Sequence, residues 1–587
     1  MTSQPDEQMI QSESQVQQLG RLQLLAVLLS LMLTLLLSAL DQTIVGTALP
    51  RIIAELQGFD LYPWVLTAYL LASTTMVPIV GKLSDQFGRK WLLLASVLVF
   101  LVGSILAGSS QTMENLIFFR GLQGLGAGSA QTLCFTIVAD LFPPSERARW
   151  TGIFTAIFGF ASVIGPAAGG WITDHWGWRW AFYINLPLAA LAFVALLIWL
   201  PRTHLFQGAA ERGWAVVRQV DLLGSLTAAG ATICLLLGLS WGGQTFPWTS
   251  WQVIGTLSAA CVLFIIFFPV ERRAQEPILP LSLLRNQIFT ASALLTLLIG
   301  MALLALTVYI PLFIQAVQGQ SATSSGIVVT PLMVSLTVAS IVCGALVSWL
   351  GRYQWSVVLG AALLVVGAFL MTRVSLSTSA LTITGNMIVL GLGVGASLPI
   401  VTVAVQNAIP QRFLGVGTGA ISYLRQLGST LGVALIGSIV NTIFANELPR
   451  RLPPAAFQLP HSVLAAATSL QVLESPTARQ TLIHRLVQGA VRQAVAQAIA
   501  QVPPGPHHDQ IVAQVKAQVT AHVTAQVTSL LEQIFAVSRS ALATGIEHAF
   551  VVALAISGII LIVSFFLKDI PFKQQKQHAP AAVEGVK

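Results

Sequence analysis

Long apolar runs separated by short polar loops recur along the whole of this 587-residue chain. Hydrophobic residues make up 55% of it and charged residues only 9%, whereas a soluble globular chain carries roughly 25% charged residues. A helix of about 20 apolar residues is long enough to cross the hydrocarbon core of a bilayer. We therefore expect an all-α polytopic membrane protein. The apolar runs are 22–46, 61–81, 91–109, 115–139, 150–173, 180–200, 221–241, 251–270, 289–316, 324–350, 355–374, 380–406, 416–441 and 545–567.

Lysine and arginine are concentrated in the short loops that follow even-numbered runs. Only Arg51, Arg179 and Arg373 lie in the short loops or at the helix ends after odd-numbered runs, and the long segment after the thirteenth run is outside this count because long translocated segments escape the rule. Because cytoplasmic loops carry an excess of Lys and Arg, we expect the even-numbered loops and both termini in the cytoplasm of a plasma-membrane protein. The net charge of +8 then reflects orientation in the membrane and not binding of nucleic acid.

The stretch GKLSDQFGRK, from Gly81 to Lys90, is charged although it joins two apolar runs, which predicts a tight turn that faces water. Its skeleton returns in GALVSWLGR, from Gly344 to Arg352, with two glycines, a leucine and an arginine at the same spacing. This repeat predicts two related six-helix halves, with the seventh and eighth runs inserted between them. In such proteins a substrate site lies between the halves near the bilayer midplane.

A polar stretch of roughly 100 residues separates the last two runs, which is too long for a loop without secondary structure. Valines at every fourth position from Val515 to Val527 predict helix, and the prolines of 502–508 predict a break before it. We therefore expect a helical hairpin outside the cell that continues into the last span. The expected segments are a cytoplasmic tail (1–20), an N-terminal six-helix bundle (21–200), a linker with two extra helices (201–285), helices 9–13 of the C-terminal bundle (286–441), the hairpin insertion (442–544), the last span (545–567) and a cytoplasmic tail (568–587).

The charged repeat and three other motifs resemble motifs of the major facilitator superfamily. Gly81–Lys90 resembles motif A, which implies that Asp85 accepts hydrogen bonds from the start of the thirteenth helix, near Gly415 and Gly417. The resemblance also implies that Arg89 pairs with an aspartate, so that the two halves are locked together on the cytoplasmic side. Anchoring by positive charge alone is the alternative. The residues of this conformational latch are Gly81, Asp85, Gly88, Arg89 and Asp140.

Two further motifs place charged residues inside apolar runs. SALDQTIVGTALP resembles motif D1 of fourteen-helix drug/proton antiporters and contains Asp41, and RGLQGLGAG resembles motif B and begins with Arg120. A carboxyl group in apolar surroundings can exchange a proton near neutral pH, and the resemblance gives both residues a role in proton coupling. The alternatives are that water at a helix end solvates Asp41 and that Arg120 reaches the outer surface.

The motif GFASVIGPAAGG lies on the fifth run and resembles motif C, which marks drug/proton antiporters within the superfamily. Its glycines and proline should bend this helix and set its packing against the opposite half. A purely structural kink is the alternative. The residues of this motif are Gly159, Gly165, Pro166, Gly169 and Gly170.

Polar and aromatic side chains on several runs are candidates for lining a substrate cavity. Arg425 is the deepest cation of the C-terminal half, and its candidate partners are a substrate, a carboxylate across the cavity or backbone carbonyls. The same helix carries no acid in its apolar run, which argues against divalent cationic substrates. The candidates are Thr43, Gln123, Phe158, Tyr309, Phe313, Tyr423 and Arg425.

The sequence contains no sign of a cofactor, a metal site or an enzyme's catalytic site. It has no P-loop, no paired catalytic carboxylates and no nucleophile beside a base, which argues against an ATP-driven pump and against an enzyme. The four cysteines lie far apart in apolar runs, and we interpret His507, His508 and Asp509 as a solvated turn.

The resemblance as a whole implies a fourteen-helix multidrug efflux antiporter of the QacA and EmrB kind. Such a protein exports hydrophobic or cationic drugs in exchange for protons and confers antibiotic resistance. We expect a monomer whose partners are protons, small hydrophobic substrates and membrane lipids, and the sequence specifies no accessory protein. An exporter of lipids or metabolites, aided by the outer hairpin, is one rival, and a sensor or scaffold is another.

Overall fold

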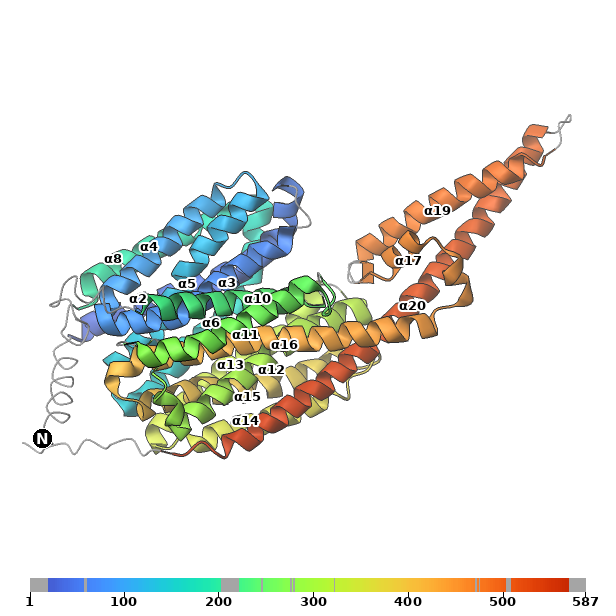
Figure 1. Ribbon diagram of the computed structural model, residues 1–587. Coiled ribbons are helices and arrows are strands. Elements are labelled where there is room, and N and C mark those ends of the chain that lie inside the picture. The colour runs from blue at the N-terminus through green and yellow to red at the C-terminus, as the bar shows by residue number, and fades with distance from the viewer. Residues whose placement is uncertain are drawn as a thin grey trace, which may run out of the picture.

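The protein is almost entirely helical in the part of the chain that the computed structural model describes (Figure 1). Thirteen helical segments there are long and apolar enough to cross a membrane. A fourteenth helix, α5 (Met113–Leu141), is equally long, but Arg120, two glutamines and several glycines lower its hydropathy. Every predicted span therefore corresponds to a helix. The described residues are 20–56, 61–201, 221–243, 246–274, 277, 280–320, 322–469, 472–473, 476–502 and 508–569.

The N-terminal half contains the first six spans, and the sixth is divided at Ile184 into two helices. Its core is a cluster of buried apolar side chains from these helices, with Tyr69, Phe100 and Phe154 among the largest. Close helix packing in this half uses small residues, since α5 meets α3 at Gly124 and Gly128. The helices are α2 (Arg21–Leu56), α3 (Tyr62–Phe87), α4 (Arg89–Gly108), α5, α6 (Pro144–His175), α7 (Trp180–Tyr183) and α8 (Asn185–Trp199).

The C-terminal half contains the ninth to fourteenth spans around a second and larger apolar core. Its first span ends in a π-helical turn, η5 (Phe313–Val317), and its fifth span, α16, runs ten residues past the predicted end at 441. The other helices are α12 (Gln287–Leu312), α13 (Ala322–Leu350), α14 (Gln354–Met371), α15 (Ala380–Ala408), α16 (Leu414–Arg451) and α20 (His508–Ser564), with short turns η4 (Leu283–Arg285) and η6 (Gln411–Phe413).

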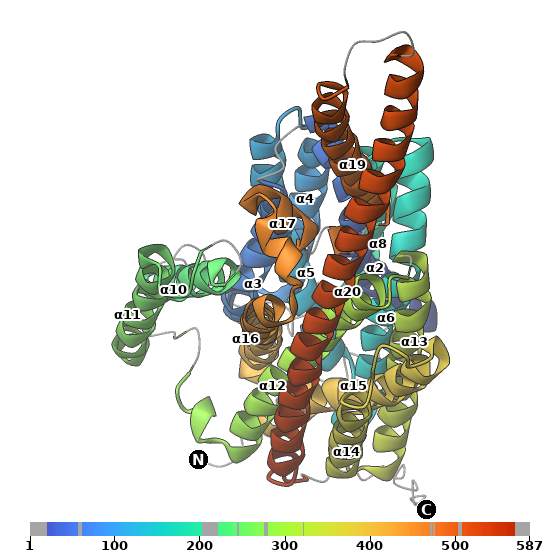
Figure 2. The same ribbon diagram turned by 90° about the vertical axis from the view of Figure 1, so that its right-hand side faces the viewer.

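The inserted pair consists of α10 (Leu222–Trp241) and α11 (Trp251–Arg273), which pack against each other at the edge of the molecule (Figure 2). α10 also contacts α3 of the N-terminal half and α16 of the C-terminal half. The pair therefore lies beside the junction of the two halves and belongs to the core of neither.

The charged stretch from Gly81 to Lys90 differs from the predicted water-facing turn. α3 continues to Phe87 and α4 begins at Arg89, so only Gly88, with a φ of 88°, separates two helices. The side chains of Lys82, Arg89 and Lys90 are buried. The prediction of a solvated turn was wrong because these cations find protein partners: the Lys90 ammonium donates to the carbonyl oxygens of Leu197 (2.8 Å) and Leu200 (2.5 Å). We call this end of the molecule the latch end.

A helical hairpin projects from the opposite end, which we call the hairpin end (Figure 1). After α16 the chain forms η7 (Pro454–Gln458), α17 (His461–Ala467) and α19 (Pro476–Ile499), which packs along α20. α20 is 57 residues long and continues without interruption from the hairpin into the last span, as the sequence predicts. Most of the predicted proline break at 502–508, namely 503–507, lies outside the described residues.

Candidate functional site

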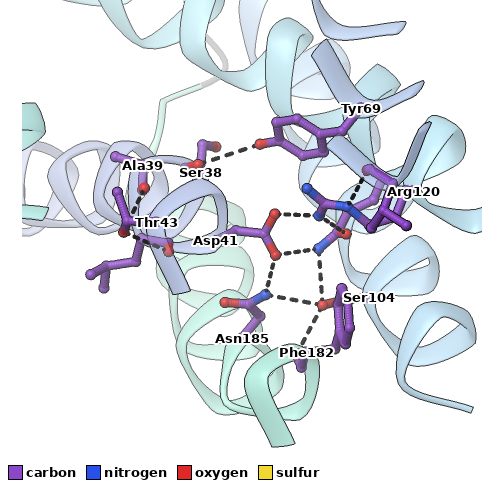
Figure 3. Close-up of polar contacts among 12 residues, drawn as sticks. Ser38, Ala39, Asp41, Thr43, Tyr69, Ser104, Arg120, Phe182 and Asn185 are labelled. Atoms are coloured by element: carbon purple, nitrogen blue, oxygen red, sulfur yellow. Dashed lines mark hydrogen bonds and ion pairs between the residues drawn. The ribbon is translucent and has the colours of Figure 1, made fainter. Parts of the chain in front are cut away.

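Asp41 is fully buried within the N-terminal half, where three side chains donate hydrogen bonds to its carboxylate (Figure 3). Arg120 Nη1 lies 2.5 Å from Oδ2, and Gln123 Nε2 and Asn185 Nδ2 lie 2.8 Å and 2.9 Å from Oδ1. Ser104 Oγ accepts from both amides at 3.1 Å. Five residues from α2, α4, α5 and α8 thus form one connected polar cluster, which we call the acid network.

Arg120 is held by more than its ion pair. Its Nε donates to the carbonyl oxygen of Val65 (3.3 Å), its Nη1 also donates to Gln123 Oε1 (2.7 Å), and its guanidinium carbon lies 4.2 Å from the ring centroid of Tyr69. Nη2 has no hydrogen-bond partner among the described residues. Arg120 therefore faces the interior and does not reach the surface near Glu114. A buried ion pair is tolerated only with such additional hydrogen bonds, because both charges have lost their hydration.

Asn185 and Ser104 were not among the residues that the sequence singled out for this site. Asn185 is the first residue of α8, and Ser104 lies four residues before the end of α4. Each is a polar residue inside an apolar run, which is the signal that was available. Nothing in the sequence shows that residues separated by 144 positions, such as Asp41 and Asn185, meet.

The latch end is closed by Asp85, whose carboxylate accepts hydrogen bonds from the first backbone N–H groups of α16. Asp85 Oδ1 lies 3.1 Å from Gly415 N, and Oδ2 lies 3.0 Å from Val416 N. A carboxylate is favoured there, since the start of a helix has unpaired N–H groups and a positive partial charge. The backbones nearly touch: a Cβ atom on Gly81 would lie 2.6 Å from Gly415 O. Gly417, the other expected partner, instead faces Ile409.

Arg89 connects this contact to the rest of the N-terminal half. Its Nη2 lies 2.5 Å from Asp85 Oδ1 and its Nε lies 2.9 Å from Asp140 Oδ2, and all three side chains are at least 93% buried. Arg89 Nη1 also donates to Ser84 Oγ (2.7 Å). The guanidinium therefore holds the orientation of the carboxylate that contacts the other half.

The second copy of the repeat makes a related but weaker contact. Ser348, which replaces the aspartate, accepts a hydrogen bond from the backbone N–H of Arg149 on α6 (3.1 Å). Beside it, Arg147 Nη1 donates to Gln406 O and Asn407 Oδ1, each at 3.2 Å. α3 meets α16, and α6 meets α13, so both pairs of helices join the halves at the latch end.

The glycines of the fifth span allow α6 to lie close to two helices at once. A Cβ atom on Gly165 would lie 1.8 Å from Thr43 Oγ1 on α2, and one on Gly159 would lie 2.0 Å from Thr337 Oγ1 on α13. Gly169 also faces α2, whereas a Cβ atom on Gly170 would meet open space. The side chain of Pro166 lies outside the described residues. α6 therefore bridges the helix that carries Asp41 and the opposite half.

The seven cavity candidates fall into different environments. Gln123 belongs to the acid network, and Tyr309 and Phe313 are buried in the C-terminal core. Thr43 donates within α2 and to Ala161 O of α6, and Phe158 is half-buried against the N-terminal core. The Tyr423 hydroxyl lies 3.0 Å from Thr232 Oγ1 of α10. Arg425 is half-buried. Contact of these residues with substrate stays a prediction.

The part of α2 at the hairpin end carries one more ion pair. Arg179 contacts Glu55, and Trp178 Nε1 donates to the same carboxylate at 3.0 Å. The hydrogen bond from Arg179 holds the pKa of Glu55 below its usual range. Both charged side chains are exposed to solvent, at 36% and 49%.

Comparison with known proteins shows the family to which the chain belongs. Residues 31–433 match the family model of the Major Facilitator Superfamily. The chain is 38% identical over 441 residues to the multidrug transporter protein MdtP of Bacillus subtilis (strain 168), which covers 75% of this chain and 80% of that protein. It is 37% identical over 422 residues to multidrug resistance protein 3 of the same organism, covering 72% and 80%.

Among solved structures, the human organic anion transporter MFSD10 (TETRAN) superposes with a TM-score of 0.54 at 16% identity, covering 71% of this chain and 93% of that one. This likeness shows the fold alone. The fold and the family match define a multi-pass membrane transporter and not an enzyme, so the expected fold class is confirmed. The chain belongs to the major facilitator superfamily.

Proposed function

We propose that the protein exports hydrophobic and cationic small molecules across the plasma membrane in exchange for protons, by alternating access. Its similarity to a multidrug transporter and a multidrug resistance protein supports export of drugs. The observation that carries the proton-coupled part is the buried Asp41 carboxylate, which is the titratable group at the centre of the acid network. In the proposed orientation the latch end and both termini face the cytoplasm.

Protonation of Asp41 would change the charge balance of the acid network. When a proton binds the carboxylate, the ion pair with Arg120 is lost and a buried guanidinium charge is left without its counterion, which is costly. The network then favours a rearranged conformation. Because α6 contacts both α2 and α13, a shift of α2 is transmitted directly to the interface between the halves.

The latch is the second element of the cycle. In the closed state Asp85 binds the start of α16, and opening toward the cytoplasm requires loss of both N–H···O bonds. The cycle we propose begins with outward release of substrate and protonation of Asp41, continues with opening of the latch, and ends with release of the proton into the cytoplasm. The halves rock as rigid bodies, and the site lies between them.

Transport by the reconstituted full-length protein tests this proposal. In proteoliposomes with an imposed pH gradient, Asp41→Asn should reduce gradient-driven ethidium transport at least tenfold, while Asp174→Asn, at an exposed acid near the end of α6, should leave it unchanged. Since Asp41→Asn also unbalances Arg120, the double variant Asp41→Asn/Arg120→Gln provides a charge-balanced check. Undiminished gradient-driven transport in both variants would overturn the proposal.

One observation favours a second candidate function, export of lipids or other amphiphiles. The α19–α20 hairpin is continuous with the last span and projects well beyond the bundle (Figure 1), so it can accompany a hydrophobic molecule away from the membrane. Removal of 460–530 would separate the two functions. Ethidium transport should survive this deletion, whereas transfer of a fluorescent phospholipid to acceptor vesicles should be lost if lipid is the cargo.

A further inference from the structure

Arg425 is a cation in the middle of a span, and the described structure gives it no counterion. It lies eleven residues after Leu414, the first residue of α16, which at about 1.5 Å per residue is about 16 Å from the latch end. That depth is near the middle of a hydrocarbon core about 30 Å thick. Among the described residues Arg425 has neither an ion pair nor a side-chain hydrogen bond.

The contacts of neighbouring residues on α16 show which way Arg425 faces. Gln426 contacts α3 through Thr74, and Gly428 packs against α12 at Leu297 O. Successive helix residues are rotated by about 100°, so Arg425 lies between the face toward α3 and the face toward α12. Tyr423, nearly opposite, contacts α10 at the edge of the molecule. Arg425 therefore faces the interior between the two halves and not the lipid.

Gln426 adds a second donor without an acceptor at the same depth. Its Oε1 accepts a hydrogen bond from Thr74 Oγ1 across the junction of the halves (2.7 Å), but its Nε2 is buried without a partner among the described residues. Buried donors are almost always satisfied, and charged residues inside spans usually meet a partner or a water-filled path. The Gln426 amide is thus a buried donor without an acceptor, and beside it the half-buried Arg425 guanidinium is a charge without a counterion among the described residues.

The protein's own deep acid is not free to supply that acceptor. Asp41 is fully buried and already receives three hydrogen bonds, and the acids of the latch, Asp85 and Asp140, are paired with Arg89. The side chain that faces the space between the halves is therefore positively charged, and a bound anionic group can supply its complement.

We infer that Arg425, with the amide of Gln426, binds the acidic group of an amphiphilic substrate, such as a carboxylate, sulfonate or phosphate. This inference rests on the proposed transport function and names a substrate class beyond lipophilic cations. A guanidinium binds such groups through two parallel hydrogen bonds, and Coulomb attraction at a site removed from bulk water adds to them. The same charge disfavours dications, because it repels them.

Equilibrium binding of two dyes with one xanthene skeleton tests the inference. Fluorescein is anionic and rhodamine 123 is cationic, and fluorescence anisotropy measures their affinities for purified full-length protein in phosphatidylcholine nanodiscs. Arg425→Gln should weaken fluorescein at least tenfold while rhodamine 123 binds equally well or more tightly. Arg425→Lys, which keeps the charge but loses the planar fork, should weaken fluorescein by only about threefold. Arg373→Gln, at an exposed arginine outside the spans, is the matched control.

An unchanged fluorescein affinity in Arg425→Gln would overturn the inference, and so would an equal loss for both dyes, which would indicate a structural role. Nanodiscs with phosphatidylglycerol distinguish the source of the acid: if this lipid displaces fluorescein from the wild type, the site binds a lipid headgroup and the substrate assignment is wrong. The binding comparison needs no proton gradient. If the transport experiment overturned the proton-coupled function, the inferred binding of acidic groups at Arg425 would therefore still be tested by the dye comparison.

Discussion

Each half of this transporter carries an arginine deep in a span, and the two arginines differ in burial and in whether they have a counterion. Arg120 in the N-terminal half is fully buried, paired with Asp41 and surrounded by further hydrogen-bond partners. Arg425 in the C-terminal half is half-buried and has no acidic partner in the described structure. The difference suggests that one half holds the titratable group and the other offers a charge to the substrate.

Replacing each arginine by glutamine gives the sharpest test of this contrast. Arg120→Gln leaves the buried Asp41 charge without its counterion, which should lower the free energy of unfolding by about 3–5 kcal/mol. Arg425→Gln removes an uncompensated charge and should leave stability unchanged or raise it. Thermal unfolding in detergent measures both variants. Equal destabilisation by the two substitutions would break the comparison.

The comparison of Arg120 with Arg425 applies to the state in which the two halves are held together at the latch end. There the carboxylate of Asp85 binds the start of α16 in the opposite half. Asp85→Asn keeps the shape but loses the charge, and it should weaken the closed state by about 1.5–3 kcal/mol, the range for a hydrogen bond to a charged group. A cysteine at Thr132, which is buried beside Gly419 of the opposite half, reports opening in a background without native cysteines. Its reaction with a thiol reagent should become at least tenfold faster; an unchanged rate would argue against the latch.

The position of Asp41 also depends on close packing between α2 and α6. Gly165→Val places a branched side chain where Thr43 Oγ1 would lie 1.8 Å from the new Cβ, and such overpacking typically costs about 1–3 kcal/mol. Gly170→Val, on the same helix but facing open space, should cost far less. Thr43→Ala should rescue part of the loss in Gly165→Val. Equal melting temperatures for the two valine variants would contradict this packing.

The smallest effect is expected at the exposed end of α2. Because the pKa of Glu55 is lower in the folded protein, its ion pair with Arg179 stabilises the fold above the unfolded pKa of about 4.3, and that contribution is lost as pH falls through the lower folded value. Glu55→Gln should therefore lower the free energy of unfolding at pH 7 by less than about 1 kcal/mol, which appears as a slightly lower melting temperature. The difference in stability between wild type and Glu55→Gln should vanish at acidic pH. A stability difference that grows as the pH falls would contradict a lowered pKa of Glu55 in the folded protein.

The sequence predicts the helices well because each apolar run must form a helix in lipid whatever its neighbours are. It also anticipates the contact of Arg89 with Asp140, since a motif shared with a known family supplies the partner. The chemistry of Gly81–Lys90 was less accessible. Sequence alone shows three cations and suggests that water surrounds them, whereas in the fold all three are buried, Lys90 binds carbonyl oxygens and Arg89 binds carboxylate oxygens.

The acid network was only partly predictable for a related reason. Asp41 and Arg120 stand out as charges in apolar runs, but their pairing and the contributions of Asn185 and Ser104 arise from contacts between four helices. The orientation of Arg425 was equally hidden, because it depends on which helices contact the residues around it. Contacts between residues so far apart in the sequence depend on how the helices pack, and the sequence of a single chain does not show that packing.

Proton release from the purified protein tests the central claim most directly. If Asp41 gives up a proton when substrate binds, addition of ethidium to weakly buffered, detergent-solubilised wild-type protein should release protons. Asp41→Asn should bind ethidium with no proton release. Equal release from wild type and Asp41→Asn would contradict the account, because the proton would then come from another group.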